Sequence, residues 1–356
     1  MTNQSNRSHR IALIPGDGIG HEVVPAAMQV VEAAARKFGF TIQTEELPWG
    51  CEFYARTGAM MPKDGIDRLR GFDSILLGAC GYPGVPDHVS LWGLLIPIRR
   101  EFMLYANVRP IKLFPGVPCP LVGRKPGDID FVVVRENVEG EYSQVGGRIY
   151  EGTPDEVAIQ QAVFTRKGTD RILKYAFDLA KTRRNKVTSA TKSNGIIHSM
   201  PFWDERFAEM AKAYPGVETN QFHIDILTAH FVQHPDWFDV VVASNLFGDI
   251  LSDLGPAIAG SIGIAPSGNL NPEGEHPSMF EPVHGSAPDI AGKGVANPIA
   301  TIWSAAMMLR HLGEAEAADA IEAAMAVTLA DADSRTRDLG GKADTKIATE
   351  AVLAAL

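Results

Sequence analysis

Cysteines are scarce in this 356-residue sequence, and long apolar runs are missing. The three cysteines, Cys51, Cys80 and Cys119, are widely spaced and form no CxxC pair. A disulfide framework or a thiolate metal site is therefore not expected, and a reducing compartment such as the cytoplasm fits. No segment approaches the roughly 18 consecutive apolar residues that would indicate a membrane span.

Clusters of positive charge are missing as well. The formal net charge is -10, and no run of lysine and arginine occurs. We therefore expect neither a nucleic acid nor a membrane as a partner. The polar segment Met1–Arg10 has no apolar core, so it does not resemble a secretory signal, and we expect a frayed tail.

The dinucleotide-binding fingerprint is present only in part. In the segment from Gly16 to His21, the histidine stands where the last glycine of GxGxxG belongs. No acidic residue follows at the end of a clear second strand, about 20 residues later. The loop therefore argues against a standard Rossmann site.

What the sequence does contain is an alternation of strand and helix patterns. Short apolar runs predict buried strands at 10–14, 74–79, 131–135, 186–188 and 240–243. Apolar residues at three-to-four spacing predict helices over 23–35, 169–181, 301–312 and 315–329. This alternation predicts an α/β fold with a largely parallel sheet. A hairpin is predicted at 146–152, and a second subunit could cover its edge.

An acidic pair follows the predicted strand 240–243. Asp249 and Asp253 stand four residues apart at the start of a helical pattern, so they share a helix face. Two carboxylates there repel unless a cation lies between them, and hard oxygen ligands favour a divalent metal. A solvated acidic pair is the alternative, but the neighbouring residues are apolar or small, which favours the metal.

Three arginines are candidates for binding carboxylates. Arg99 and Arg109 stand ten residues apart, and Arg135 ends a predicted strand, where side chains of α/β proteins face a ligand crevice. The guanidinium fork matches carboxylate geometry, so three arginines suggest a substrate with more than one carboxylate. Surface ion pairing is the alternative for each arginine taken alone.

Two further segments carry chemistry. Lys192 and Tyr142 can act as base and acid if burial or neighbours shift their pKa values, although isolated residues of these types are more often structural. The segment 280–294 is rich in glycine, serine and proline, so its backbone could approach a phosphate, and Asp289 could accept from a ribose. An irregular surface loop is the alternative.

Together these segments resemble the metal-dependent β-decarboxylating dehydrogenases, which include isopropylmalate, isocitrate, homoisocitrate and tartrate/D-malate dehydrogenases. The resemblance runs from about Ile11 to the C-terminus. It rests on residues 15–20, Arg99, Arg109, 135–137, Tyr142, Lys192, Asp225, Asp249, Asp253 and 284–289. Residues 86–93 and 114–121 look like the tartrate/D-malate branch.

The resemblance implies an isopropylmalate dehydrogenase-like two-domain α/β fold with a mixed sheet core, distinct from the standard Rossmann fold. Residues 1–104 and 262–356 would form a larger, discontinuous cofactor-binding domain. Residues 105–261 would form a smaller domain with a dimerisation hairpin near 143–165. The expected assembly is a homodimer with shared active sites.

The resemblance also implies residue roles. Asp249 and Asp253, with Asp225 from the other subunit, would bind Mg²⁺ or Mn²⁺, and the three arginines would bind the substrate carboxylates. Lys192 from the other subunit would take the C2 hydroxyl proton, and Tyr142 would protonate the carbon left after decarboxylation. The expected cofactor is NAD, with K⁺ as a further candidate. The implied cofactor-binding residues are His284, Gly285, Ser286, Ala287, Asp289, Asn297 and Asn194.

The expected substrate is a small 2-hydroxy dicarboxylate, D-malate or tartrate. Trp92 stands near the position of a glutamate in isopropylmalate enzymes and would leave less room beside C3, unless it is simply a core tryptophan. Pro97 is expected to bend the helix that carries Arg99. A 3-isopropylmalate dehydrogenase is the alternative enzyme, and a catalytically inactive metal- or carboxylate-binding homologue is the non-enzymatic alternative.

Overall fold

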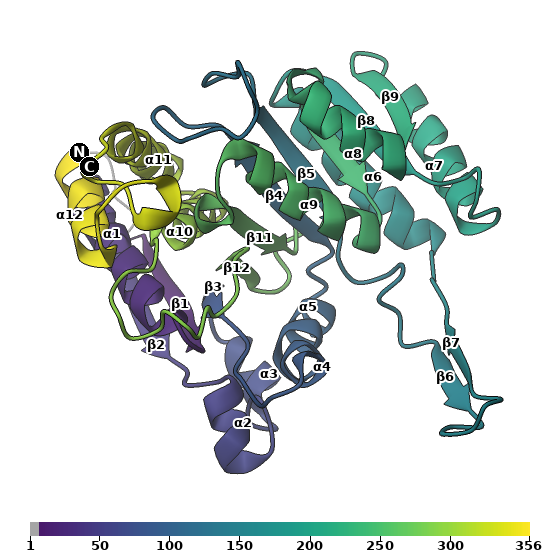
Figure 1. Cartoon of the computed structure of the whole chain (residues 1–356), viewed down its shortest axis with the longest axis horizontal. Coiled ribbons are helices and arrows are strands. Elements are labelled where there is room, and N and C mark those ends of the chain that lie inside the picture. Colours follow the sequence, from purple (N-terminus) through teal and green to yellow (C-terminus); the bar gives the residue numbers. More distant parts are fainter. Residues whose placement is uncertain (1–6) are drawn as a thin grey trace.

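The computed structural model describes residues 7–356, and its framework is one ten-stranded sheet with helices on both faces (Figure 1). The strands of this sheet are β1 (Ser8–Gly16), β2 (Thr41–Glu46), β3 (Ser74–Ala79), β4 (Ala106–Lys112), β5 (Asp130–Glu136), β8 (Lys186–Thr191), β9 (Glu218–His223), β10 (Val240–Ala243), β11 (Pro266–Leu270) and β12 (Ser278–Pro282). Their order is β2-β1-β3-β12-β11-β4-β5-β10-β8-β9.

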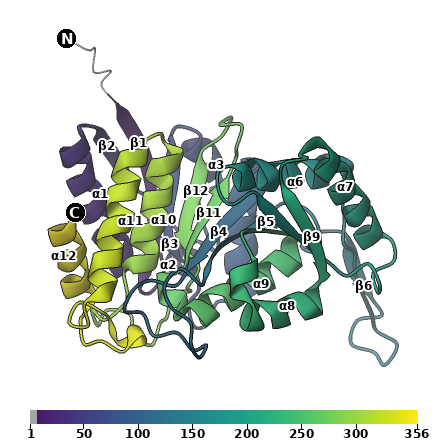
Figure 2. The same ribbon diagram turned by 90° about the horizontal axis from the view of Figure 1, so that it is seen from above.

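Within residues 7–356, twelve α-helices connect and cover these strands. They are α1 (Gly20–Phe38), α2 (Cys51–Thr57), α3 (Gly65–Leu69), α4 (Asp87–Ser90), α5 (Ile96–Glu101), α6 (Arg166–Lys181), α7 (Ser199–Ala213), α8 (Ile224–Gln233), α9 (Asn245–Ala259), α10 (Ile299–His311), α11 (Ala315–Ala330) and α12 (Thr345–Ala355). Figure 2 shows α6 and α7 on one side of the sheet formed by β5, β10, β8 and β9, and α8 and α9 on the other side.

The sheet is parallel in its two wings and antiparallel in its centre. Strands β12, β11, β4 and β5 pair antiparallel in that order. In one wing, β1 pairs in parallel with both β2 and β3. In the other wing, β5, β10, β8 and β9 pair in parallel in that order. The expected mixed-sheet α/β fold is thus confirmed, and a largely parallel sheet describes only the wings. Because β5 and β10 run in parallel with Arg135 opposite Ala243, the residues that follow both strands lie at the same edge.

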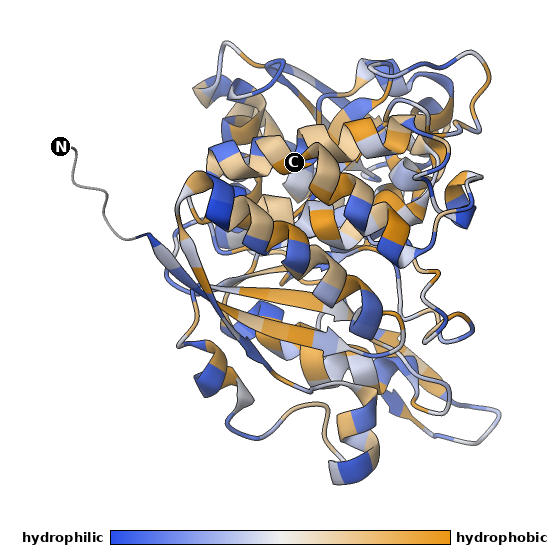
Figure 3. Ribbon diagram, turned by 90° about the vertical axis from the view of Figure 1, so that its left-hand side faces the viewer, coloured by the Kyte–Doolittle hydropathy of each residue, from blue (hydrophilic) through white to orange (hydrophobic). Residues whose placement is uncertain are grey.

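The period-two alternation of β1 separates two hydrophobic cores. Ile11 belongs to the larger core, whereas Ala12 and Ile14 belong to the second core on the opposite face. Figure 3 shows hydrophobic residues along the strands and hydrophilic residues toward the outer sides of the helices. Burial on both faces explains why the strands of this sheet are continuous apolar runs in the sequence.

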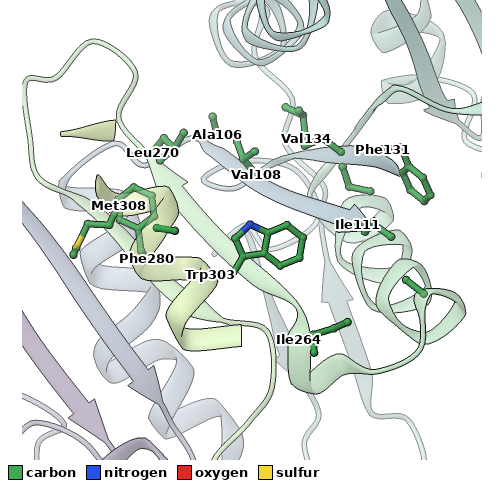
Figure 4. Close-up of a cluster of buried hydrophobic side chains, with 14 of the residues drawn as sticks. Ala106, Val108, Ile111, Phe131, Val134, Ile264, Leu270, Phe280, Trp303 and Met308 are labelled. Atoms are coloured by element: carbon green, nitrogen blue, oxygen red, sulfur yellow. The ribbon is translucent and has the colours of Figure 1, made fainter. Parts of the chain in front are cut away.

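Helix α10 fills the larger core beside the antiparallel centre of the sheet. Figure 4 shows Trp303 projecting from this helix into a cluster with Ile111, Phe280 and Ile264. The Trp303 ring also meets Phe114 edge to face, with ring centroids 5.1 Å apart. This packing joins the C-terminal helices to β4, the strand that carries Arg109.

The strands and helices predicted from periodicity are confirmed, with two adjustments. The predicted hairpin exists as β6 (Gly146–Ile149) paired with β7 (Val157–Gln160), and it projects from the rest of the chain (Figure 1). The predicted N-terminal tail is wrong for Ser8–Arg10, which pair with Thr41–Gln43 in the sheet; residues 1–6 lie outside the described residues. Within residues 7–356, no helix is both long and apolar enough to cross a membrane.

Candidate active site

The segment after β5 is anchored on the first turn of α9. The Glu141 carboxylate accepts hydrogen bonds from the Leu246 backbone N–H (3.0 Å) and the Ser244 hydroxyl (2.8 Å). An acidic side chain is favourable here, because the first N–H groups of a helix have no partner within the helix. The next residue, Tyr142, is thereby held against α9, where its hydroxyl donates to Asp249 Oδ2 at 2.8 Å.

Arg135 connects the end of β5 to the same helix. Its Nη1 donates to Asp249 Oδ1, and its Nε and Nη2 donate to Asn245 Oδ1 at 3.1 and 2.7 Å. The side chain is only 4% exposed. A Cβ placed on Gly248 would stand 2.6 Å from both Cβ and Cγ of Arg135, so this glycine allows α9 to lie directly on the arginine.

The other two arginines enter from β4 and α5. Arg109 Nη1 donates to the Ser252 hydroxyl at 2.7 Å and lies 3.4 Å from Asp253 Oδ1. Arg99 Nη2 donates to Glu281 Oε1 at 2.7 Å, and both of these side chains are buried. Three guanidinium groups and an acidic pair therefore meet, although they come from four separate segments of the chain.

Burial and charge shift several pKa values in this group. Burial lowers the pKa of Arg135 to about 10 and also lowers that of Arg109, so both remain cationic at neutral pH. Burial opposes ionisation of Asp249, but Arg135, Tyr142 and Arg109 outweigh it and hold the pKa of this carboxyl below its ordinary value. Burial raises the pKa of Asp253, and burial together with the Asp249 hydrogen bond raises that of Tyr142. Tyr142 is therefore protonated at neutral pH and can donate.

These side chains surround one cavity of about 160 Å³. Its lining residues are Leu91, Ile96, Arg99, Arg109, Arg135, Asn137, Tyr142, Asn245 and Asp249. The volume suits a small, polar molecule, and the three arginines require it to carry negative charge. The structure thus brings the three arginines, Tyr142 and Asp249 together around this cavity, and the roles expected of them remain predictions.

A π-helical turn determines which apolar residues face this cavity. The turn covers Leu91–Leu95, between α4 and α5, and the Ile96 N–H donates to the Leu91 carbonyl. Pro97 follows and has no N–H to offer the carbonyl of Gly93, so a regular hydrogen-bond ladder must break here. Where a bend is expected at Pro97, the structure has a widened, π-helical turn just before the proline.

The widened turn corrects the expectation for Trp92. Leu91 and Ile96 line the arginine cavity, whereas Trp92 lines a different cavity of about 510 Å³ with Met60. The Arg100 guanidinium lies 4.9 Å from the centre of the Trp92 ring. The apolar wall of the site is therefore formed by leucine and isoleucine, and the proposed crowding of C3 by Trp92 is wrong for this structure.

Lys192 and Asp225 form a separate pair. Lys192 follows β8, Asp225 lies in the first turn of α8, and Nζ and Oδ1 are 2.9 Å apart. The Lys192 hydrogen bond lowers the pKa of the Asp225 carboxyl. Neither residue lines the arginine cavity, and residues 7–356 of one chain bring together no group of three acidic, histidine or cysteine side chains suited to a metal. Asp225 is thus not joined to Asp249 and Asp253 within one chain.

Comparison with known proteins decides the family. The model of the isocitrate/isopropylmalate dehydrogenase family matches residues 10–356. The chain belongs to this family. It is 58% identical to the D-malate dehydrogenase [decarboxylating] of Escherichia coli (strain K12) over 354 residues, covering 97% of this chain and 98% of that protein. It is also 58% identical to the tartrate dehydrogenase/decarboxylase of Pseudomonas putida over 348 residues, covering 95% of each.

The solved structures agree with this assignment. The isocitrate dehydrogenase from Methylococcus capsulatus superposes with a TM-score of 0.88 at 37% identity, covering 98% of this chain and 99% of the other. The resemblance to this dehydrogenase family and the fold class expected from it are both confirmed.

The loop expected to hold the cofactor, residues 284–289, packs on the glycine loop at residues 15–20. The Ile19 N–H donates to the Ser286 carbonyl at 2.9 Å, and a Cβ on Gly18, whose φ is +57°, would stand 2.1 Å from the same oxygen. Gly18 of the incomplete fingerprint therefore permits a close contact between two loops.

Other residues expected to bind the cofactor differ in their surroundings. His284 has its pKa lowered by burial, and its Nε2 is buried without a partner among the described residues. Asp289 is exposed, while Asn297 is engaged with Asp338 at 3.0 Å. Asn194 lies in the loop after β8, five strands from β12, so one chain does not bring it to the loop at 284–289. The cofactor roles of these residues and of Gly285 and Ala287 remain predictions.

Sequence reasoning assigned no role to several residues of the cavity. Asn245 precedes Asp249 by four residues on the same helix face and could have been found from that spacing. Asn137 follows Arg135 by two residues, which would continue the same face of the strand. Leu91 could not be found this way, because the hydrophobic periodicity of a sequence does not predict a π-helical turn.

The tight contact at Gly248 yields a test of the site. We expect Gly248→Ala to push Arg135 away from α9, because the new methyl group would meet it at 2.6 Å. Overpacking of this kind costs about 1–3 kcal/mol, more than the helix propensity of alanine returns. Thermal unfolding and the substrate KM measure the effect. Gly216→Ala, where a Cβ meets nothing within 4 Å, is the control; equal behaviour of the two variants would contradict the close packing.

Proposed function

We propose that the protein is an NAD- and divalent-metal-dependent dehydrogenase that oxidises a 2-hydroxy dicarboxylic acid. The favoured reactions convert D-malate to pyruvate and CO₂, and tartrate to oxaloglycolate or its decarboxylated product. The observation that carries this proposal is the cavity in which Arg99, Arg109 and Arg135 meet Tyr142 and Asp249. The names of the two relatives at 58% identity support the same substrates.

The arginines and the acidic pair suit the two kinds of ligand that this reaction needs. Substrate carboxylates would replace Asp249 and Asp253 as acceptors for Arg135 and Arg109. The two aspartates, which offer hard oxygen donors four residues apart on α9, would then hold Mg²⁺ or Mn²⁺ together with the partner subunit's Asp225. When bound, the cation supplies positive charge that favours loss of the C2 hydroxyl proton and stabilises the enolate, and NAD supplies the hydride acceptor.

The proton transfers are assigned to lysine and tyrosine. The partner subunit's Lys192 would take the proton of the C2 hydroxyl as hydride leaves C2. The arginines would hold both carboxylates while CO₂ is lost from the resulting 2-keto acid. Tyr142, whose raised pKa keeps it protonated, would then deliver a proton to the carbon.

For the cofactor we propose NAD rather than NADP. The residues proposed to hold its adenosine half are His284–Ala287, Asp289 and Asn297, with Asn194 from the other side of the site. Asp289 is exposed on this loop, and its negative charge would oppose the 2′-phosphate of NADP.

The proposed assembly is a homodimer with shared active sites. Apolar side chains stand exposed on the hairpin, namely Ile149, Tyr150, Val157 and Ile159, and on α8 and α9, namely Ile226, Leu246 and Ile250. These would be covered by the second subunit. We further propose two domains, 1–104 with 262–356 and 105–261, which both line the cavity through Leu91 and Arg135. Limited proteolysis between them would test the division.

The protein is proposed to work in the cytoplasm, where its free cysteines would stay reduced. Fractionation of the source cells would test this, and recovery outside the cytoplasm would contradict it.

The substrate proposal is tested by measuring kcat/KM for D-malate, L-tartrate and 3-isopropylmalate, each with NAD or NADP and with Mn²⁺. We expect D-malate and L-tartrate to exceed isopropylmalate by about tenfold or more, because a small cavity rejects a bulky C3 group. Isopropylmalate as the best substrate would favour the alternative, an isopropylmalate dehydrogenase. No turnover of any of the three would favour an inactive homologue, and equal use of NADP would refute the role of Asp289.

The metal proposal predicts that Asp249→Asn lowers kcat/KM by about 100-fold or more, because one ligand charge is lost. Excess Mn²⁺ should restore part of the activity, and calorimetric titration should show weaker Mn²⁺ binding. Asp67→Asn removes an exposed carboxylate of α3 and is the matched control. Unchanged Mn²⁺ affinity in Asp249→Asn would contradict the assignment.

Shared sites predict recovery of activity from two inactive variants. Lys192→Ala and Asp249→Ala subunits, mixed at equal concentration and allowed to exchange, should form heterodimers with one intact site each. About one quarter of wild-type activity is expected when exchange is random. Native mass spectrometry of differently tagged subunits would establish exchange, and absence of activity despite exchange would refute shared sites.

A further inference from the structure

A buried acceptor on a residue that lines the arginine cavity has no hydrogen-bond partner among residues 7–356. Asn137 lines the cavity, is 2% exposed, and its Oδ1 makes no hydrogen bond with the described residues. A buried carbonyl oxygen without a partner is unfavourable, so such groups in a binding site point to a ligand donor. The proposed roles of the arginines, lysine and tyrosine leave Asn137 unexplained.

The orientation of the Asn137 amide is fixed by its surroundings. Its Nδ2 donates to the Leu104 carbonyl (3.0 Å) and to Asn269 Oδ1 (2.9 Å). Asn269 is itself oriented, because its Nδ2 donates to the Glu281 carboxylate at 2.8 Å. Rotating the Asn137 amide would set its oxygen against two acceptors. The chain of bonds from Glu281 therefore leaves Oδ1 as the unpaired acceptor of a residue that lines the cavity.

We propose that Asn137 accepts a hydrogen bond from a hydroxyl group on C3 of the substrate, so that it selects a 2,3-dihydroxy dicarboxylate such as tartrate. This inference rests on the proposed function. The guanidinium groups of the cavity are hydrogen-bond donors only. They can therefore pair with carboxylates but cannot accept a hydrogen bond from a substrate hydroxyl. Within the substrate, a group at C3 is the remaining place for a donor.

The C2 oxygen does not fit the same role. It loses its proton during oxidation and becomes a carbonyl, which is an acceptor and would face the acceptor of Asn137 unfavourably. The C3 hydroxyl keeps its proton throughout the oxidation step. With D-malate, which has only hydrogens at C3, water must satisfy Oδ1 instead.

The test replaces Asn137 by leucine, which has a similar volume and no polar atom, and measures kcat/KM for D-malate and for L-tartrate or meso-tartrate, whichever the wild type uses better. We expect the ratio of tartrate to D-malate to fall by about tenfold or more, because a site built to bind a hydroxyl discriminates against its absence. An unchanged ratio would overturn the proposal.

Asn107→Leu provides a matched control. Asn107 is also fully buried and also donates to Asn269 Oδ1 (2.9 Å). Its Oδ1 likewise has no partner among residues 7–356, but Asn107 does not line the cavity. It should lower thermal stability as Asn137→Leu does while leaving the tartrate to D-malate ratio unchanged. A similar fall of the ratio in both variants would show a purely structural effect and refute the role of Asn137.

A substrate series on the wild-type enzyme keeps the inference testable if Asn137→Leu does not fold. In 2R-configured 3-methylmalate a methyl group replaces the C3 hydroxyl and leaves Oδ1 without a donor. We expect about tenfold lower kcat/KM than for tartrate, and equal or better use of the methyl compound would overturn the proposal. Turnover of neither D-malate nor tartrate by the wild type would instead refute the proposed function itself.

Discussion

Three buried guanidinium groups around one small cavity constrain the rest of this structure. A buried charge is tolerated only when it is paired and hydrogen-bonded, so Arg99, Arg109 and Arg135 each need anionic partners within reach. Helix α9 supplies Asp249 and Asp253, and β12 supplies Glu281. Glu281 lies in β12, whereas Asp249 and Asp253 lie in α9, which follows β10. The arginines therefore require the antiparallel centre of the sheet and the parallel wing to meet at one edge. The close approach of α9 to β5 at a glycine follows from the same requirement.

The pairing of arginines with aspartates also suggests how the site accommodates its ligands. In the proposed function, substrate carboxylates and a divalent cation carry opposite charges, so they would exchange partners with the existing ion pairs without leaving a buried charge alone. Asp253 has a raised pKa and is the more exposed member of the acidic pair, so its charge is the less well compensated of the two. Binding of a cation there would relieve this, which couples cation binding and carboxylate binding through shared side chains.

Much of this arrangement could be predicted from the sequence, because it depends on local periodicity. The spacing of Asp249 and Asp253 placed them on one helix face, and the position of Arg135 at a strand end placed it at the crevice. The wall of the cavity could not be predicted in this way. A π-helical turn spans Leu91–Leu95, and Leu91 rather than Trp92 lines the cavity. Asn137 is oriented by Asn269 and Glu281, more than a hundred residues away in sequence. Such details arise from the tertiary structure, and the pairing of Lys192 with Asp225 is another of them.

The cavity therefore has walls of different chemistry around its charged arginines. The carboxylates that these arginines would bind are common to all the substrates considered for this family. Leu91 and Ile96 offer an apolar surface, and Asn137 offers an oriented acceptor. In the proposed function the arginines would hold the carboxylates, so they would not distinguish one 2-hydroxy dicarboxylate from another. Discrimination must then come from the groups beside C3. An apolar wall separates substrates by size only modestly, whereas a buried acceptor separates those with a hydroxyl from those without one more strongly, because the unpaired group is costly. Under the proposed roles, the selectivity of this site would therefore depend on the balance between Leu91 and Asn137, which both line the cavity.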